Sequence, residues 1–291
     1  MLKSKVIAIT GANGFIGSYL TEYLKDRGYS IKAITHHLPE NRKKGITYFE
    51  WDLRDDIDSS VFNDVDVLVH CAYKRKVGCS DSEEVNRIGS KKLIESSKCS
   101  GVKQIIFLSS FSSDKSAKSS YGRQKFYIEK EILKCGGLVI QAGLVIGKGG
   151  LFQAILNQFK DKRIFPLIND GSQELQTISV DDLSCIIEKC IVEEMQGVIL
   201  AAESKPVSYK EFLTAIANVK QTKIKFVHLP YWFLNAALYI TELFGLSMPV
   251  TRDNLNGLAK IKYKDVKESL DRLRIEPEMY LESIKKYIKS E

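Results

Sequence analysis

Short apolar, β-branched runs alternate with longer amphipathic segments through the first half of the chain. The runs predict strands at 6–10, 31–35, 46–51, 65–70, 103–109 and 138–146. The segments between them predict helices at 15–28, 82–101 and 121–137. Each predicted helix ends in glycine soon after its last apolar residue, as helix C-termini often do. Continuous apolar strands that alternate with amphipathic helices indicate a parallel sheet covered on both faces. The pattern therefore predicts a doubly wound α/β domain.

The second half of the chain is less regular. Its periodicity predicts helices near 150–160, 180–194, 208–218, 231–245 and 278–290, and strands near 175–179 and 197–201. We expect residues 1–147 to form a dinucleotide-binding domain, to which residues 172–203 return. Residues 148–291 are expected to form a smaller substrate-binding cap. Open α/β sheets bind ligands at the carboxyl ends of their strands, so the cap is expected there.

Composition and charge exclude several classes of protein. The net charge of +7 comes from scattered lysines, without an arginine-rich run or a basic stripe with interleaved aromatic residues, so we expect no nucleic-acid partner. The six cysteines show neither C-x-x-C pairs nor zinc-ligand spacing, so we expect no metal. They are expected to be reduced thiols in a cytoplasmic protein. The first residues run directly into a strand-like segment, which agrees with that location.

The longest apolar stretch, 231–246, is shorter than a bilayer span and contains Glu242. We expect a buried helix and no transmembrane segment. Contact of this helix with a membrane surface or a partner stays open at this point, as does formation of a homodimer.

The most specific motif is TGANGFIG, Thr10 to Gly17, which follows the first predicted strand and opens a helix. Glycines at 11, 14 and 17 permit a tight turn, let the backbone approach a pyrophosphate and allow close packing of helix on strand. The helix N-terminus presents N–H groups to the anion. The turn therefore predicts dinucleotide binding, with contacts from Gly11, Asn13, Gly14, Phe15, Ile16 and Gly17.

This TGxxGxxG turn resembles the signature of short-chain dehydrogenases/reductases, in particular the extended and atypical branch of nucleotide-sugar epimerases, dehydratases and reductases. Further segments resemble that family in the same order along the chain: WDL at 51–53, VLVHCAY at 67–73, Asn86, and ISVDDL at 178–183. The resemblance implies a Rossmann fold. It also implies cofactor contacts from Asp52, Leu53, Cys71, Ala72, Tyr73, Asn86 and Ser109. We expect His70, between these segments, to support the sheet rather than act as a base.

Two Tyr-x-x-x-Lys patterns occur, Tyr121/Lys125 and Tyr263/Lys267. The first opens the helix after the strand that ends in Ser-Ser, and its two residues lie one helical turn apart on one face. An ammonium group beside a phenol favours the phenolate, which makes tyrosine a usable proton donor and acceptor. The second pattern lacks such a setting. We therefore expect Tyr121 and Lys125 to be catalytic, and the resemblance implies Ser110 as the hydroxyl that holds the substrate oxygen.

The end of the second predicted strand bears on the choice of cofactor. NAD-dependent enzymes tend to carry a carboxylate there, on the adenosine ribose. This chain has Thr35 and His36, which we expect to contact the cofactor, and basic residues follow at 42–44. The absence of a carboxylate favours NADP(H), while NAD(H) stays possible.

Departures from the family pattern narrow the reaction. Phe111 and Ser112 stand where the dehydratases of this family carry Asp-Glu, which argues against a 4,6-dehydratase. Gln141 replaces the arginine of the usual Arg-Pro-Gly at the sixth strand. We expect 4-keto reduction or C4 epimerisation of a nucleotide-linked sugar. The alternatives are a non-catalytic NADP(H)-binding subunit or sensor, and a reductase of an apolar ketone.

Overall fold

The structure is a computed structural model that describes residues 5–74, 82–244 and 251–289. The chain forms two compact units that interleave along the sequence. The first unit takes Met1–Ser109, Gln124–Gln141 and Ser184–Ile199, and the second takes Ser110–Arg123, Ala142–Leu183 and Leu200–Glu291. The predicted domain boundary after residue 147, with residues 172–203 returning to the first domain, stays a prediction.

A seven-stranded sheet organises the first unit. Its strands are β1 (Val6–Thr10), β2 (Ser30–Thr35), β3 (Ile46–Glu50), β4 (Val67–His70), β5 (Gln104–Ser110), β6 (Leu138–Ala142) and β11 (Gly197–Ala201). They lie in the order β3-β2-β1-β4-β5-β6-β11. Strand β1 pairs in parallel with both β2 and β4. Because the order along the sheet changes direction between β1 and β4, the carboxyl ends of these two strands form a topological switch point. The predicted doubly wound α/β fold is confirmed.

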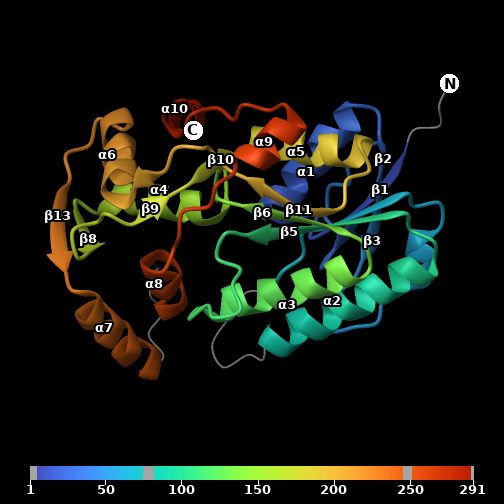
Figure 1. The fold of residues 1–291 in the computed structure, drawn as a ribbon, viewed down its shortest axis with the longest axis horizontal. Helices are drawn as coiled ribbons and strands as arrows, with labels where there is room; N and C mark the ends of the chain where they lie inside the picture. The colour runs from blue at the N-terminus through green and yellow to red at the C-terminus, as the bar shows by residue number, and fades with distance from the viewer. Residues whose placement is uncertain (1–4, 75–81, 245–250, 290–291) are drawn as a thin grey trace. The chain divides into compact units, whose positions relative to one another are not determined.

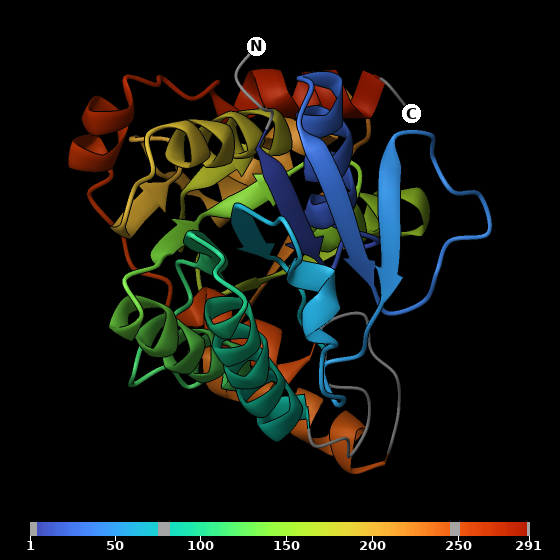
Figure 2. The same cartoon turned by 90° about the vertical axis from the view of Figure 1, so that its right-hand side faces the viewer.

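Helices cover both faces of this sheet. They are α1 (Phe15–Asp26), α2 (Ser82–Cys99), α3 (Ser120–Lys134) and α5 (Val180–Val192), with a short 3-10 helix, η1, at Ser59–Phe62. Helices α1 and α5 lie on one face, and α2 and α3 lie on the other (Figures 1 and 2). The side chains that the strands turn toward α2 and α3, among them Leu68, Phe107 and Val139, pack with Leu93 and Ile132 into one buried cluster.

The second unit consists of short strand pairs and helices. Its strands are β7 (Leu144–Ile146), β8 (Ile164–Ile168), β9 (Glu174–Leu175), β10 (Thr177–Ser179), β12 (Val207–Ser208) and β13 (Lys225–Leu229). Its helices are α4 (Gly150–Asp161), α6 (Tyr209–Val219), α7 (Tyr231–Leu243), α8 (Arg252–Ala259), α9 (Lys267–Leu273) and α10 (Tyr280–Lys289). Strand β10 pairs with β7 and β13 with β8, both in parallel, whereas β12 pairs with β9 in antiparallel orientation.

The strand predicted at 138–146 is divided in the structure, which corrects that prediction. Strand β6 ends at Ala142 in the large sheet, and β7 begins at Leu144 and pairs with β10. The division falls at Gly143, where an added Cβ would lie 2.2 Å from the carbonyl oxygen of Gln176. The apolar run continues through the glycine because residues on both sides of it are buried, so hydrophobicity alone did not reveal the break.

No helix in the described part of the chain is long and apolar enough to cross a membrane.

Candidate functional site

The predicted glycine turn forms at the carboxyl end of β1 and is tightly packed. Gly11 has a φ of +68°, and a Cβ there would lie 2.8 Å from the backbone of Ala72 after β4. Gly17, in the first turn of α1, approaches even more closely, because its Cβ would lie 2.2 Å from the carbonyl oxygen of Gly11. Gly14 caps α1, without a side-chain cap, and its amide donates to the same carbonyl at 2.8 Å. No side chain therefore caps the N-terminus of α1, whose first amides lie at this turn.

The loops after β2 and β3 are fixed by polar contacts around the turn. The side-chain amide of Asn13 donates to the carbonyl of His37 at 2.7 Å. Asp52 accepts two hydrogen bonds from the guanidinium of Arg54 and forms an ion pair with His36. The Arg54 guanidinium holds the pKa of the Asp52 carboxyl well below its usual range. Asp52 is therefore ionised, and it orients His36 rather than standing free.

Thr35 lies differently from the sequence-based expectation of an accessible residue at the end of β2. It is 1% exposed, and its hydroxyl donates to the carbonyl of Phe49 at 3.3 Å. The first exposed side chains after the strand are those of His36 and His37. If a phosphate or hydroxyl group of a ribose reaches this edge, His36 is the better placed of the two predicted contacts.

A buried hydrogen-bonded chain supports the end of β4. His70 is fully buried, with Nδ1 at 2.7 Å from the hydroxyl of Thr10 and Nε2 at 2.8 Å from the hydroxyl of Ser90. Burial lowers the pKa of His70 to about 3. The imidazole is thus neutral at physiological pH, and it joins β1, β4 and α2 as a structural group. The hydroxyl of Thr10 also accepts from the amide of Ala72 at 3.3 Å, which fixes the backbone beside the glycine turn.

The segment that leaves β4 is held by Asn86. Its side-chain oxygen accepts from the amide of Lys74 at 2.7 Å, and its nitrogen donates to the carbonyl of Lys74 at 2.8 Å and to Gln124 at 2.9 Å. Cys71 and Tyr73 lie on the short stretch that this clamp closes, and both are partly exposed. Asn86 is 1% exposed, and in this structure its side chain fixes the loop after β4 and connects it to Gln124 of α3.

The remaining predicted cofactor contacts differ in exposure. Phe15 and Ile16 open α1 and are half-buried. Leu53 is buried, and its carbonyl oxygen lies so close to α2 that a Cβ on Gly89 would approach it to 2.1 Å. Leu53 therefore packs the sheet edge against α2.

Lys125 is the most unusual side chain on the sheet's carboxyl side. It is 4% exposed, and its ammonium donates to the carbonyl of Leu108 in β5 at 2.8 Å. The ammonium also lies 4.5 Å from the ring centre of Phe107 and 5.3 Å from that of Tyr73. Burial lowers the pKa of Lys125 to about 8. A buried lysine with a pKa this close to neutrality is the kind of group found where proton chemistry takes place.

Ser109 and Ser110, at the end of β5, have different partners. The hydroxyl of Ser109 donates to the carboxylate of Glu129 in α3, and that carboxylate also accepts from Gln141 in β6 at 3.0 and 3.1 Å. The Ser110 hydroxyl accepts from the amide of Ser112 at 3.2 Å, and the residue is half-buried. Of the two serines, Ser109 has its hydroxyl bonded to a carboxylate, and Ser110 does not.

Tyr121 lies in the first turn of α3, four residues before Lys125, and is half-buried. The N-terminus of α3 is capped from a distant segment, because Asp253 of α8 accepts from the amides of Ser120 at 2.6 Å and Tyr121 at 3.3 Å. The competing pattern is not helical in the same way, since Tyr263 precedes α9 and only Lys267 belongs to that helix. The structure thus places the first pair, and not the second, on one helix face.

Sequence reasoning noted Gln141 only as a departure from the family pattern, and it missed Glu129 and Asp253. Glu129 could have been found from its spacing, because Tyr121, Lys125 and Glu129 follow one another at intervals of four residues. Nothing in the local sequence connects Asp253 with a helix that begins at residue 120. Among the described residues, no group of three or more His, Cys, Asp or Glu side chains could hold a metal ion.

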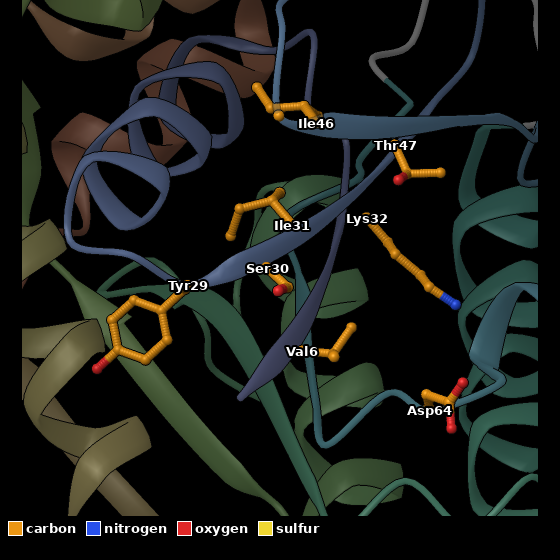
Figure 3. Close-up of a pocket in the computed structure, with 9 residues that line it drawn as sticks. Val6, Tyr29, Ser30, Ile31, Lys32, Ile46, Thr47 and Asp64 are labelled. Atoms are coloured by element: carbon orange, nitrogen blue, oxygen red, sulfur yellow. The ribbon is translucent and has the colours of Figure 1, made fainter. Parts of the chain in front are cut away.

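A hollow of about 540 Å³ lies elsewhere on the first unit. Its lining comes from the amino ends of β1, β2 and β3, with Lys32, Thr47 and Asp64 at its rim (Figure 3). The ammonium of Lys32 already donates to the carbonyls of Val61 and Asn63. Since this edge is opposite to the carboxyl ends of the strands, the hollow is not part of the candidate site.

The parallel sheet, its switch point and the glycine turn after β1 define a Rossmann-like α/β protein. The chain belongs to the NAD dependent epimerase/dehydratase family, whose model matches residues 7–197. UDP-glucose 4-epimerase of Vibrio cholerae is 24% identical over 91% of this chain and 90% of its own length. The decarboxylating sterol-4-alpha-carboxylate 3-dehydrogenase of Mus musculus is 24% identical over 85% of this chain and 77% of its own.

Among solved structures, MoeE5 in complex with UDP-glucose and NAD superposes with a TM-score of 0.76. It is 16% identical, and the match covers 97% of each chain. The resemblance to extended short-chain dehydrogenases/reductases is therefore confirmed at the level of family and fold.

Proposed function

We propose that this protein transfers hydride between a nicotinamide cofactor and a carbon of a nucleotide-linked sugar, as a 4-ketoreductase or a C4 epimerase. The observation that carries the proposal is the placement of Lys125, which is buried, bonded to the carbonyl of Leu108 and one helical turn from Tyr121. Membership of the epimerase/dehydratase family and the UDP-glucose 4-epimerase relative support the reaction class.

The residues of the glycine turn fit a dinucleotide. A Cβ at Gly11 or Gly17 would collide with backbone, and Gly14 leaves the first amides of α1 without a side-chain cap. Such a turn suits the close approach of a pyrophosphate. When bound, the nicotinamide would supply or accept the hydride.

The side chains of the protein would handle the proton. The pKa of a tyrosine is ordinarily about 10, which makes the phenol a poor base at neutral pH. The ammonium of Lys125 would favour the phenolate of Tyr121, and the phenol would then donate a proton to a carbonyl oxygen or remove one from an alcohol. Ser110, with its uncommitted hydroxyl, would hold the same substrate oxygen.

For the cofactor, we propose a preference for NADP(H). His36 and His37 are the first exposed side chains after β2, and Asn13 holds the backbone of His37. Of the carboxylates near these residues, Asp52 bonds Arg54 and His36, and Glu50 lies 3.4 Å from Nδ1 of His37. A 2′-phosphate would therefore meet these carboxylates only beside a basic side chain.

The test compares three variants. Tyr121→Phe keeps the ring but removes the exchangeable proton, so turnover should fall by about 10²–10⁴-fold while NADPH binding changes little. Lys125→Met should weaken both turnover and binding, and Tyr263→Phe, the control, neither. NADPH oxidation is followed against a panel of 4-keto nucleotide sugars and simple ketones. Unimpaired turnover by Tyr121→Phe would refute the mechanism, and NADPH binding without any turnover by the parent would favour a non-catalytic binding protein.

A second candidate substrate is an apolar ketone. The expectation of a buried helix at 231–246 was wrong, because helix α7 and its C-cap residue expose large apolar side chains: Phe244 is 72% and Trp232 69% exposed, and Phe233, Tyr239 and Ile240 are about half exposed. The name of the mouse relative gives a sterol carboxylate as its substrate. Activity in the same panel on a sterol-like ketone, and none on nucleotide sugars, would favour this candidate.

A further inference from the structure

The inner face of α3 carries a second buried charge, one turn after Lys125. Glu129 is 6% exposed. Its carboxylate accepts hydrogen bonds from the hydroxyl of Ser109 and from the side-chain amide of Gln141. Both of these donors are neutral. The carboxylate acts on the nearest buried cation, whose charged form it favours.

That cation is Lys125, since the two residues lie four apart on α3. Together they bind consecutive residues of β5, because Lys125 donates to the carbonyl of Leu108 and Glu129 accepts from Ser109. The helix is thereby fixed to the end of β5 at two adjacent points, one through each charge.

The other titratable groups that act on Lys125 come from the end of β4 and from α3 itself. His70 is neutral, because burial lowers its pKa to about 3. Burial opposes the charge on Lys125 most strongly, and Cys71 and then Glu129 favour that charge. From α2 and from α3 the neighbouring Asn86 and Gln124 are neutral amides, and Tyr121 precedes Lys125 on the same helix. Among these groups, Glu129 is the carboxylate.

We propose that Glu129 is a positioning residue for Lys125: it fixes α3 to the end of β5 through Ser109 and places a carboxylate one helical turn from the buried ammonium. Gln141 leaves this charge available, because its amide bonds the carboxylate without neutralising it. The consequence for turnover rests on the proposed function, but the effect on the protonation of Lys125 does not.

The direct measurement is a pH titration of Lys125 by NMR in protein labelled with ¹³C at lysine Cε, with the signal assigned by its loss in Lys125→Met. In Glu129→Gln the titration midpoint should fall, because the change removes a carboxylate that favours the charged form of Lys125. Glu129→Asp should restore most of the midpoint. The matched control is Glu131→Gln, the same change on the same helix at a carboxylate that pairs with Lys134.

A second route covers the case in which Glu129→Gln fails to fold. Gln141→Arg keeps Glu129 but pairs it with a fixed cation, so the midpoint of Lys125 should again fall. An unchanged midpoint in both variants, or an equal fall in Glu131→Gln, would overturn the proposal.

If the parent turns over a substrate, its rate should decline at alkaline pH as Lys125 loses its proton, and Glu129→Gln should move that decline to lower pH. Equal loss of turnover at every pH would mean a merely structural role and would contradict the proposal. A parent that neither turns over nor binds NADPH would refute the proposed function, while the NMR titration would still decide the role of Glu129.

Discussion

Replacing Gly17 by alanine should destabilise the protein through one identified contact. The new Cβ would lie 2.2 Å from the carbonyl oxygen of Gly11 and 2.8 Å from its carbon, both rigid backbone atoms. Overpacking against backbone costs about 3 kcal/mol at the upper end of its usual range, and the better helix propensity of alanine returns about 1 kcal/mol. The expected net loss is about 2 kcal/mol, equivalent to a fall of roughly 5 °C in the unfolding midpoint.

The matched variant is Gly14→Ser, in the same turn. Gly14 has φ −75° and ψ 168°, an extended conformation that serine adopts readily, and serine is a better N-cap than alanine. Its Cβ would lie 3.1 Å from the Gly11 oxygen, so a shift of a few tenths of an ångström suffices. Thermal unfolding followed by circular dichroism should therefore show little change, whereas fluorescence titration should show much weaker NADPH binding. An unaltered midpoint in Gly17→Ala would refute the steric reasoning, and unaltered affinity in Gly14→Ser would remove the turn from the cofactor site.

Three further predictions follow from other parts of the first and second units. The parent should bind NADPH more tightly than NADH, and His36→Asp should weaken NADPH binding more than NADH binding, because a carboxylate repels the 2′-phosphate; tighter NADH binding by the parent would contradict the preference. The contribution of His70 to the free energy of unfolding should fall by about 1.4 kcal/mol per pH unit as pH drops below 6.5. The reason is that unfolded histidine takes up a proton, whereas buried His70, with a pKa of about 3, does not. In His70→Gln, the free energies from urea unfolding at pH 6.5 and about pH 5 should therefore differ less than in the parent. Asp253→Ala should cost about 1–2 kcal/mol in urea unfolding by uncapping α3, and Asp253→Asn, which keeps one acceptor, should cost less; equal losses would show that the amide bonds are not the cause.

The fold of the first unit was predictable because its central strands are buried on both faces and its helices on one. Those two patterns give different periodicities, and the strand positions from β1 to β5 followed from them. The second unit was less accessible to this reasoning. Strand β8 contains Pro166, which ordinarily argues against a strand, but β8 pairs only with β13 among the described strands, so the missing amide is tolerated. Helix α8 is polar and contains Gly257, and it gave no apolar stripe to detect.

The candidate site likewise contains residues that could be predicted from the sequence and residues that could not. Tyr121, Lys125 and the glycine turn were predictable because each depends on neighbours within a few positions in the sequence. Thr35 was placed by counting along the strand, and the count could not show that its side chain turns inward to the carbonyl of Phe49. The contacts of Asp253 with α3 span 132 and 133 residues of sequence, so only the folded chain reveals them.

Residues 184–199 lie late in the sequence but belong to the first unit, which affects how the protein folds during synthesis. Gln104, buried at the start of β5, donates to the carbonyls of Cys190 and Met195, and Lys5, just before β1, bonds the carbonyl of Ile191 and the carboxylate of Glu194. A nascent chain that has emerged only as far as β6 therefore exposes β6 as a sheet edge and leaves one face without α5. Unpaired strand edges and uncovered apolar faces are what make folding intermediates aggregate. The ribosome must deliver about two-thirds of the chain before β11 can pair with β6, and by then residues 110–123 and 142–183 of the second unit have emerged as well.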